Sequence, residues 1–181
     1  MNTPPASADA VRAHAAGIRL ACFDVDGTLT DGRLWLDAEG RESKAFHIHD
    51  GLGLRLLEAQ GIRVALVTAR RSAVAEARGR ELRLSEVHVG VDDKRALLLE
   101  LCARHGFGPE HAAMMGDDLV DLGAMAVAGL AAAPADAHPW VLARAHWCSR
   151  AGGGRGAARE FCDLLLAAQG RTEAVLATYL P

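Results

Sequence analysis

Residues 18–28 read IRLACFDVDGT, a short apolar run that ends in two aspartates, a glycine and a threonine. The run from Ile18 to Phe23 has the length and continuous hydrophobicity of a buried strand. The glycine and the polar residues that follow it predict a loop at the end of this strand. Asp24 and Asp26 are therefore expected in the loop at the end of a strand, where their side chains would be accessible to a ligand.

Apolar runs and helical patterns alternate along the rest of the chain. The further runs predicted as strands are 62–67, 87–91 and 112–115, with short ones near 130–132 and 146–148. The predicted helices are 50–60, 72–82, 93–105, 119–127 and 156–168. This alternation predicts an α/β fold, with a Rossmann-like, mostly parallel sheet flanked by helices.

One segment interrupts the alternation directly after the first strand. Residues 31–48 contain two extended stretches around a glycine-containing turn, which predicts a β-hairpin insert that forms a small flap. No insert is long enough for a large cap domain. The expected organisation is a polar N-terminal tail (1–17), a single domain (18–170) and a C-terminal tail (171–181).

Composition limits the possible partners and compartment. The 181 residues carry a net charge of −3, which argues against a nucleic-acid-binding protein. No apolar run approaches the ~20 residues needed to span a membrane, and residues 1–17 lack a secretory signal pattern. The four cysteines are scattered, which predicts buried, reduced thiols in a cytoplasmic protein. Only two of the 20 basic residues are lysines, Lys44 and Lys94, so a lysine placed where chemistry needs one is informative.

Acidic, hydroxyl and ammonium groups follow the predicted strands. In open α/β sheets ligands bind beyond the carboxyl ends of the strands. The side chains expected at this edge are Asp24, Asp26, Thr68, Lys94, Asp117, Asp118 and Asp121. Singly, each has an ordinary structural explanation, such as a helix cap or a solvated charge. Together and in this order they indicate an active site.

The set suits phosphoryl transfer. One carboxylate can attack phosphorus to form an aspartyl-phosphate, and a second can protonate the leaving group and then activate water. Mg²⁺ typically binds one or two carboxylates together with phosphate oxygens. A hydroxyl and a lysine can bind the remaining phosphoryl oxygens.

The order DxDGT, Thr, Lys and GDD resembles the haloacid dehalogenase superfamily of phosphatases. The resemblance implies Asp24 as nucleophile, Asp26 as general acid and base, and Thr68 and Lys94 as further catalytic residues. It also implies Mg²⁺ bound by Asp24, the backbone carbonyl of Asp26 and Asp117. Asp118 and Asp121 would support this site.

Further motifs are similar to one family within this superfamily, the 3-deoxy-D-manno-octulosonate 8-phosphate phosphatases. These motifs are LTDG (29–32), KAF (44–46), DG (50–51), Gly53, Arg55, TAR (68–70), GDDL (116–119), ADAHP (135–139) and GGGRGA (152–157). The resemblance implies a sugar-acid phosphate as substrate and a role in lipopolysaccharide biosynthesis. It also implies a homotetramer in which one subunit's hairpin covers a neighbour's site. The implied substrate-binding residues are Asp26, His47, Ile48, His49, Asp50, Gly51, Arg55, Arg70, Arg78 and Lys94.

One motif departs from the family pattern. Residues 47–50 read His-Ile-His-Asp where members read Asn-x-Arg-Asp, so a histidine replaces an arginine suited to a sugar carboxylate. His47 and His49 would share one side of a strand, facing either the substrate or a neighbouring subunit. Residues 152–156 are expected to form a flexible loop in which Arg155 can reach the substrate.

Two alternative functions remain open at this point, and a third is disfavoured by the order of the motifs. The substrate could be a nine-carbon sugar-acid phosphate, because such sites differ mainly in pocket residues. The chain could be a non-catalytic assembly module of a sugar-nucleotide enzyme, but a scaffold does not need the complete set of catalytic residues. A signalling receiver domain places its phospho-acceptor on a later strand, whereas here the DxDGT unit follows the first.

Overall fold

The first strand lies at the centre of a six-stranded sheet in the computed structural model, which describes residues 7–180. Leu20 pairs with Arg63 on one side and with Ala112 on the other. All strand pairs of this sheet are parallel, in the order β5-β4-β1-β6-β7-β8. The strands are β1 (Leu20–Phe23), β4 (Arg63–Thr68), β5 (Glu86–Val89), β6 (Ala112–Met115), β7 (Leu130–Ala133) and β8 (Trp147–Cys148). The predicted α/β class and parallel sheet are confirmed.

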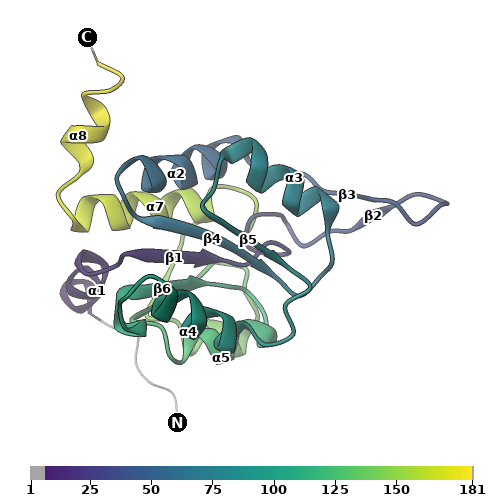
Figure 1. Cartoon of the computed structure of the whole chain (residues 1–181), viewed down its shortest axis with the longest axis horizontal. Helices are drawn as coiled ribbons and strands as arrows, with labels where there is room; N and C mark the ends of the chain where they lie inside the picture. Colours follow the sequence, from purple (N-terminus) through teal and green to yellow (C-terminus); the bar gives the residue numbers. More distant parts are fainter. Residues whose placement is uncertain (1–6, 181) are drawn as a thin grey trace.

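Helices cover both faces of the sheet (Figure 1). One face is covered by α1 (Ala8–Ala16), α2 (Ile48–Ala59), α3 (Ala73–Leu82) and α7 (Ala157–Ala168). The other face is covered by α4 (Lys94–Arg104), α5 (Leu122–Met125) and α6 (Pro139–Leu142). Two 3₁₀ turns, η1 (Pro109–His111) and η2 (Leu119–Asp121), flank β6, and α8 (Thr172–Leu176) follows α7.

Strand side chains alternate between two hydrophobic cores. Ala21 and Phe23 of β1 join the core beneath α2 and α7, whereas Leu20 and Cys22 join the core beneath α4 and α5. This period of two is the geometry of a strand, and burial of both faces explains why the runs are apolar throughout. The alanine-rich strand β7 is completely buried, because small side chains let the helices approach the sheet closely.

The structure adds helices at both ends of the domain. Residues 8–16 of the predicted polar tail form α1, while residues 1–6 and residue 181 lie outside the described range. Ser7 caps α1 by accepting a hydrogen bond from the Ala10 backbone N–H (3.2 Å), and Val11 and Ala15 are buried. The sequence did not predict α1, because its residues are mostly alanine and only Val11 and Ala15 are buried, which leaves a weak periodic pattern. In the same way, α8 lies in the predicted C-terminal tail.

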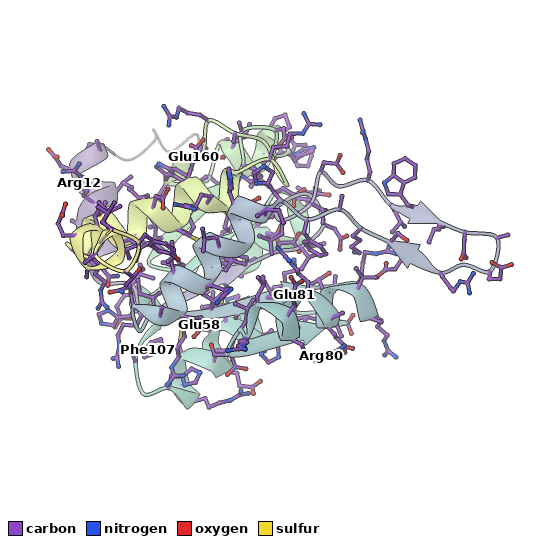
Figure 2. All side chains as sticks on the ribbon, turned by 90° about the horizontal axis from the view of Figure 1, so that it is seen from above. Arg12, Glu58, Arg80, Glu81, Phe107 and Glu160 are labelled. Carbon is purple, nitrogen blue, oxygen red and sulfur yellow. The ribbon has the colours of Figure 1, made fainter. Side chains whose placement is uncertain are left out.

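The inserted hairpin is present but its ladder is short. Its strands are β2 (Trp35–Leu36) and β3 (Glu42–Ser43), and Figure 2 shows the hairpin extending away from the body of the domain. Trp35 and Leu36 are 63% and 59% exposed. The second strand ends at Ser43, so the extended stretch does not reach residue 48 as a strand. The helix α2 begins at Ile48, with His47 as its N-cap. His47 and His49 therefore lie at a helix start, and the prediction that they share one side of a strand is wrong.

The remaining predictions about the fold concern cysteines and membranes. Cys22, Cys102 and Cys162 are buried and unpaired, but Cys148 is exposed, contrary to the prediction that all four are buried. Cys148 ends the edge strand β8, where one side of the sheet is open. Within residues 7–180, every helix is too short or too polar to cross a membrane.

Candidate active site

The carboxyl ends of three neighbouring strands bring the polar residues together. Asp24 follows β1, Thr68 ends β4 and Asp117 lies two residues beyond β6. Lys94 is the first residue of α4 and reaches the same edge from the loop after β5. The order of the strands thus converts four separated motifs into one site.

Lys94 joins two carboxylates inside the protein. Its ammonium hydrogen-bonds to Asp24 Oδ1 and donates a 2.6 Å hydrogen bond to Asp121 Oδ1. Asp24, Lys94 and Asp121 are 5%, 3% and 0% exposed. An ion pair this deeply buried stays in place only when its partners are well matched, which fixes the position of the Asp24 carboxylate.

Asp121 organises the loop after β6. Its Oδ2 accepts hydrogen bonds from the backbone N–H groups of Asp117 (3.0 Å) and Asp118 (3.2 Å). Both Asp121 oxygens are therefore occupied by donors within the protein. Asp118 is exposed, and its side chain accepts a hydrogen bond from the Leu119 N–H (2.7 Å). Asp121 thus supports the loop, and Asp118 caps the turn that follows.

The carboxylates of Asp24, Asp117 and Asp121 offer oxygens that lie within 4.8 Å of one another. Asp117 Oδ1 accepts a hydrogen bond from Thr28 (3.2 Å), whereas the described residues donate none to Asp117 Oδ2 or to Asp24 Oδ2. The backbone carbonyl of Asp26 likewise accepts no hydrogen bond from the described chain. Asp24 Oδ2 and Asp117 Oδ2 are thus unshared carboxylate oxygens in one acidic cluster, the kind of ligand that a small divalent cation such as Mg²⁺ prefers.

A glycine makes this arrangement possible. Gly27 has φ +101°, and a Cβ at this position would collide with the Asp117 carboxylate. A side chain there would therefore strain the backbone and displace the Asp117 carboxylate. This explains the glycine of the DxDGT motif in physical terms.

The electrostatics of the site also favour a cation. Burial and the nearby Asp121 carboxylate raise the pKa of Asp24 well above its usual value, against the opposing effect of Lys94. Burial and Asp121 also raise the pKa of Asp117 to about 6. Burial lowers the pKa of Lys94, but the Asp24 and Asp121 carboxylates outweigh this effect and raise it. One ammonium thus does not balance the acidic groups, and a divalent cation would relieve their repulsion.

Asp26 lies beside this group and is held at both oxygens. Thr68 donates a hydrogen bond from Oγ1 to Asp26 Oδ2 (3.3 Å), and Lys44 hydrogen-bonds to Oδ1. Lys44 follows the hairpin strand β3 and was not among the predicted site residues. Two sequence signals pointed to it, the scarcity of lysine in this chain and the KAF motif at 44–46, but neither indicated its contact with Asp26.

Several predicted substrate-binding residues form a separate group around Phe46. A small hollow beside this ring is lined in part by His47, Asp50, Gly51 and Arg78. The Arg78 guanidinium lies over the Phe46 ring (5.5 Å) and forms an ion pair with Glu81 (2.8 Å), which Figure 2 labels at the end of α3. The rings of His47 and His49 contact each other edge to face, with centroids 5.1 Å apart.

Asp50 belongs to the first turn of α2 and is buried against the start of α7. Its carboxylate accepts hydrogen bonds from the N–H groups of Arg159 (2.8 Å) and Gly156 (3.3 Å) at the start of α7. Burial raises the pKa of Asp50, and these hydrogen bonds partly oppose the shift. In this structure Asp50 therefore caps α7 and joins α2 to it.

The other predicted contacts are at the surface. Ile48 is 74% exposed, and His49 and Arg55 are also exposed. The Arg70 side chain is about half exposed and lies 3.6 Å from Glu42 of the hairpin. Arg70 is close to the catalytic edge, since its N–H donates to Thr68 Oγ1 (3.1 Å).

The glycine-rich segment at 152–156 is packed against the catalytic loop. The Gly154 N–H donates to the Thr28 carbonyl (3.0 Å), and the Gly153 N–H donates to Asp136 Oδ1 (2.8 Å). A Cβ at Gly153 would collide with the Gly27 carbonyl. The expectation of a flexible loop is not met: this segment is fixed by hydrogen bonds, and its glycines permit close backbone contact. Arg155 itself is exposed.

Comparisons with known proteins agree with this geometry. Residues 51–129 match the model of the haloacid dehalogenase-like hydrolases. The chain is 45% identical over 166 residues to the 3-deoxy-D-manno-octulosonate 8-phosphate phosphatase of Yersinia pestis, covering 92% of this chain and 89% of that protein. It is 42% identical over 169 residues to the enzyme of the same name from Escherichia coli K12, covering 93% and 89%.

Solved structures show the same similarity. The crystal structure of the Yersinia pestis phosphatase superimposes with a TM-score of 0.90 at 44% identity, covering 96% of this chain and 94% of that one. The corresponding phosphatase of Moraxella catarrhalis, solved with a magnesium ion, a phosphate ion and a KDO molecule, gives a TM-score of 0.93 at 38% identity. This second match covers 96% of this chain and 100% of the other.

A parallel sheet with these carboxylates and a lysine at its carboxyl edge defines a haloacid dehalogenase-like hydrolase. The sequence identity, at this level and over nearly the whole chain, also identifies the family within this superfamily. The chain belongs to the 3-deoxy-D-manno-octulosonate 8-phosphate phosphatase family.

Proposed function

We propose that this chain hydrolyses 3-deoxy-D-manno-octulosonate 8-phosphate to the free sugar acid and phosphate, as a step of lipopolysaccharide biosynthesis. The observation that carries the proposal is the convergence of Asp24, Asp26, Lys94 and Asp117 at one edge of the sheet. The named activity of the relatives, which match nearly the whole chain, supplies the substrate.

The first half-reaction begins at Asp24. Its carboxylate attacks phosphorus and forms an aspartyl-phosphate, while Asp26 donates a proton to the departing sugar oxygen. Lys94 and Thr68 bind phosphoryl oxygens; Lys94 already contacts Asp24, and Thr68 already contacts Asp26. Asp26 then takes a proton from water, which attacks the aspartyl-phosphate and releases phosphate.

Asp24, Asp117 and the Asp26 carbonyl would hold the Mg²⁺ ion. When bound, Mg²⁺ screens the repulsion between the Asp24 carboxylate and the phosphate dianion. Asp121 holds the loop that presents Asp117, and Asp118 caps it. We assign the supporting role to Asp121 because both of its oxygens accept hydrogen bonds within the chain. Asp24 and Asp117 each keep one oxygen that accepts none from the described residues.

The sugar would be bound outside this group by residues of α2, α3 and the loop after β4. We assign this role to His47, Ile48, His49, Gly51, Arg55, Arg70 and Arg78, with Asp50 fixing the start of α2 against α7. Arg70 is the member nearest to the catalytic edge, through its backbone contact with Thr68. Arg55, Arg70 and Arg78 provide the positive charge for the sugar carboxylate in place of the arginine replaced at His49.

A nine-carbon sugar-acid phosphate is the second candidate substrate, since the histidines at positions 47 and 49 alter the family's pocket motif. A purely non-catalytic assembly role does not explain a buried Lys94 bonded to Asp24.

We further propose that the protein is a cytoplasmic homotetramer in which one subunit's hairpin covers a neighbour's site. The hairpin supports this because it exposes Leu34, Trp35 and Leu36 at its base and first strand. A second copy of the chain would bury these apolar side chains. No nucleic acid or membrane is a partner in this proposal.

Phosphate release from a panel of sugar-acid phosphates, with and without Mg²⁺, tests the function. The expected result is Mg²⁺-dependent hydrolysis with the highest kcat/KM for the eight-carbon ester. A preference for the nine-carbon ester would replace the substrate but keep the chemistry. Absence of turnover with every phosphate ester would refute the enzyme proposal.

A further inference from the structure

We propose that Lys44 is a positioning residue that holds the Asp26 carboxylate in place for proton transfer. The inference rests on the proposed function, because it concerns the acid and base of that reaction. It assigns the segment after the hairpin a part in the chemistry, besides any part in covering the site. It adds a residue outside the DxDGT, Thr, Lys and GDD motifs.

Lys44 reaches Asp26 from a different part of the chain. The two residues are 18 positions apart, and the Lys44 ammonium hydrogen-bonds to Asp26 Oδ1. The Lys44 side chain has no exposed surface, whereas the Asp26 side chain is 25% exposed. The lysine thus approaches from inside the protein and leaves part of Asp26 open to the surface, where a substrate would arrive.

The opposite oxygen of Asp26 accepts the Thr68 hydroxyl hydrogen bond (3.3 Å). Lys44 and Thr68 therefore bind the two carboxylate oxygens from opposite sides. With Thr68 alone, the carboxylate could rotate about its Cβ–Cγ bond, because a single hydrogen bond does not fix a planar group. Two donors restrict that rotation, and proton transfer depends strongly on such geometry.

Lys44 is itself held by an acidic residue of the hairpin. Glu42 Oε2 lies 3.8 Å from the Lys44 ammonium and 3.6 Å from the Arg70 guanidinium. Glu42 Oε1 accepts a hydrogen bond from Ser72 at the start of α3. The hairpin is thus already attached to the domain through Glu42 and Ser72, so attachment alone does not require a lysine at position 44.

The burial of Lys44 also argues for a specific role. A buried ammonium is costly unless its charge is paired, and an apolar side chain of similar length would fill the same space without that cost. Arginine is otherwise the usual basic residue of this chain, with 18 arginines and two lysines. Both lysines bond to an aspartate of the DxD motif, Lys94 to Asp24 and Lys44 to Asp26.

The test compares Lys44→Met with wild type in single-turnover reactions with excess enzyme and saturating Mg²⁺. Two substrates are used, a sugar-acid phosphate with an alkoxide leaving group and p-nitrophenyl phosphate. The first needs proton donation by Asp26 and the second does not, because p-nitrophenolate is a stable anion. The expected loss in the phosphorylation rate is about 10- to 100-fold for the sugar ester and less than about threefold for the nitrophenyl ester.

A double-mutant cycle tests whether Lys44 acts through Asp26. Asp26→Asn removes the proton donor, so adding Lys44→Met should cost the sugar ester little further rate. Losses that multiply instead would mean that Lys44 acts independently, and this would overturn the proposal. Equal losses for both esters in Lys44→Met would overturn it as well.

Arg80→Met is the matched control, because it removes one positive charge from an exposed position of α3, outside the hairpin. It should leave both rates unchanged. Lys44→Gln, which retains a donor of shorter reach, replaces Lys44→Met if the latter does not unfold cooperatively. If wild type itself hydrolyses neither ester, the proposed function fails. If wild type is active, Asp26→Asn is impaired and the Lys44 variants retain wild-type rates, only the Lys44 inference fails.

Discussion

Lys94 donates a 2.6 Å hydrogen bond to Asp121, and both side chains are shielded almost completely from solvent. The pair joins the first residue of α4 to the 3₁₀ turn after β6. Through its other oxygen, Asp121 also fixes the backbone of Asp117. A carboxylate whose two oxygens both accept hydrogen bonds within the protein thus sets the positions of Lys94 and of Asp117, a proposed cation ligand.

Asp121→Asn should weaken Mg²⁺ binding more than it weakens the fold. The amide keeps the shape but loses the negative charge that pairs with Lys94, and its NH₂ group cannot accept the backbone hydrogen bonds. We expect the Mg²⁺ affinity to fall by about 10- to 100-fold, as for other residues that orient metal ligands. Titration of activity with Mg²⁺ measures this change. Asp163→Asn, on the exposed side of α7, is the control, and equal Mg²⁺ requirements in the two variants would contradict the assignment.

Asp24→Asn should abolish turnover while the protein remains folded. The amide occupies the same space but cannot form an aspartyl-phosphate, so we expect a loss of at least about a thousandfold. The variant also removes one of the buried acidic groups that repel each other in the metal-free protein. Phosphate release and thermal unfolding should be measured together. Substantial residual activity in a folded variant would rule out the covalent mechanism.

Chelation should stop the reaction, Mg²⁺ should restore it and Ca²⁺ should inhibit it. The proposed protein ligands, Asp24, Asp117 and the Asp26 carbonyl, are few, which suits a cation that keeps several waters. Ca²⁺ takes more ligands at longer distances and can recruit both Asp24 oxygens, leaving none to attack phosphorus. Rates in excess EDTA, then with each ion added back, test this. Unchanged turnover in EDTA would exclude a role for the cation.

Mg²⁺ affinity should depend on pH in a defined direction. Because the pKa of Asp117 is raised to about 6, the metal-free protein holds a proton at pH 5 that Mg²⁺ must displace. Affinity should therefore fall by up to about tenfold for each pH unit below 6. Calorimetric titrations between pH 5 and 8 measure this.

The raised pKa of Asp117 also affects how the stability of the metal-free protein depends on pH. A raised carboxyl pKa means that the folded state binds more protons than the unfolded state between pH 4 and 6. The free energy of unfolding should therefore decrease as pH rises through this range. Added Mg²⁺ should offset that decrease, so its stabilising effect on the melting temperature should grow from pH 5 to 7. A constant Mg²⁺ effect across this range would contradict the raised pKa.

Leu36→Glu should disrupt assembly without touching the catalytic edge. Leu36 is exposed on the hairpin, and a charge there would oppose burial against a second copy. Light scattering should show a tetramer for wild type and smaller species for the variant. Selectivity for the sugar-acid ester should fall, while hydrolysis of p-nitrophenyl phosphate persists. Glu39→Gln in the hairpin turn is the control, and a monomeric wild type with full selectivity would refute the assembly proposal.

Hydrophobic patterns predicted the sheet well for a physical reason. Strands such as β1 and β6 are buried on both faces, so their sequences are uniformly apolar and short, and glycines end several of the helices. α1 and α6 bury only one or two side chains each, which leaves a weak periodic signal. Their helical state depends on packing and on N-caps at Ser7 and His138.

The convergence of the acidic residues was also predictable, because parallel strands carry their loops to one edge. The contacts of Lys44 and Asp50 were not. Lys44 reaches Asp26 only through the path of the hairpin, and Asp50 meets α7 more than 100 positions along the chain. Such contacts depend on tertiary geometry that local patterns do not encode.

The central place of β1 has a consequence for synthesis on the ribosome. The strand β1 is synthesised before β6, and the loop of Thr28 cannot contact Asp117 until a further 89 residues have been made. At roughly 5–20 residues per second, translation delays this meeting by about 5–20 s. During that interval β1 lacks its neighbour β6, and its apolar side chains need protection from other nascent chains. Asp24, the proposed nucleophile, is thus synthesised well before Asp117, and the proposed cation site can form only after both loops are present.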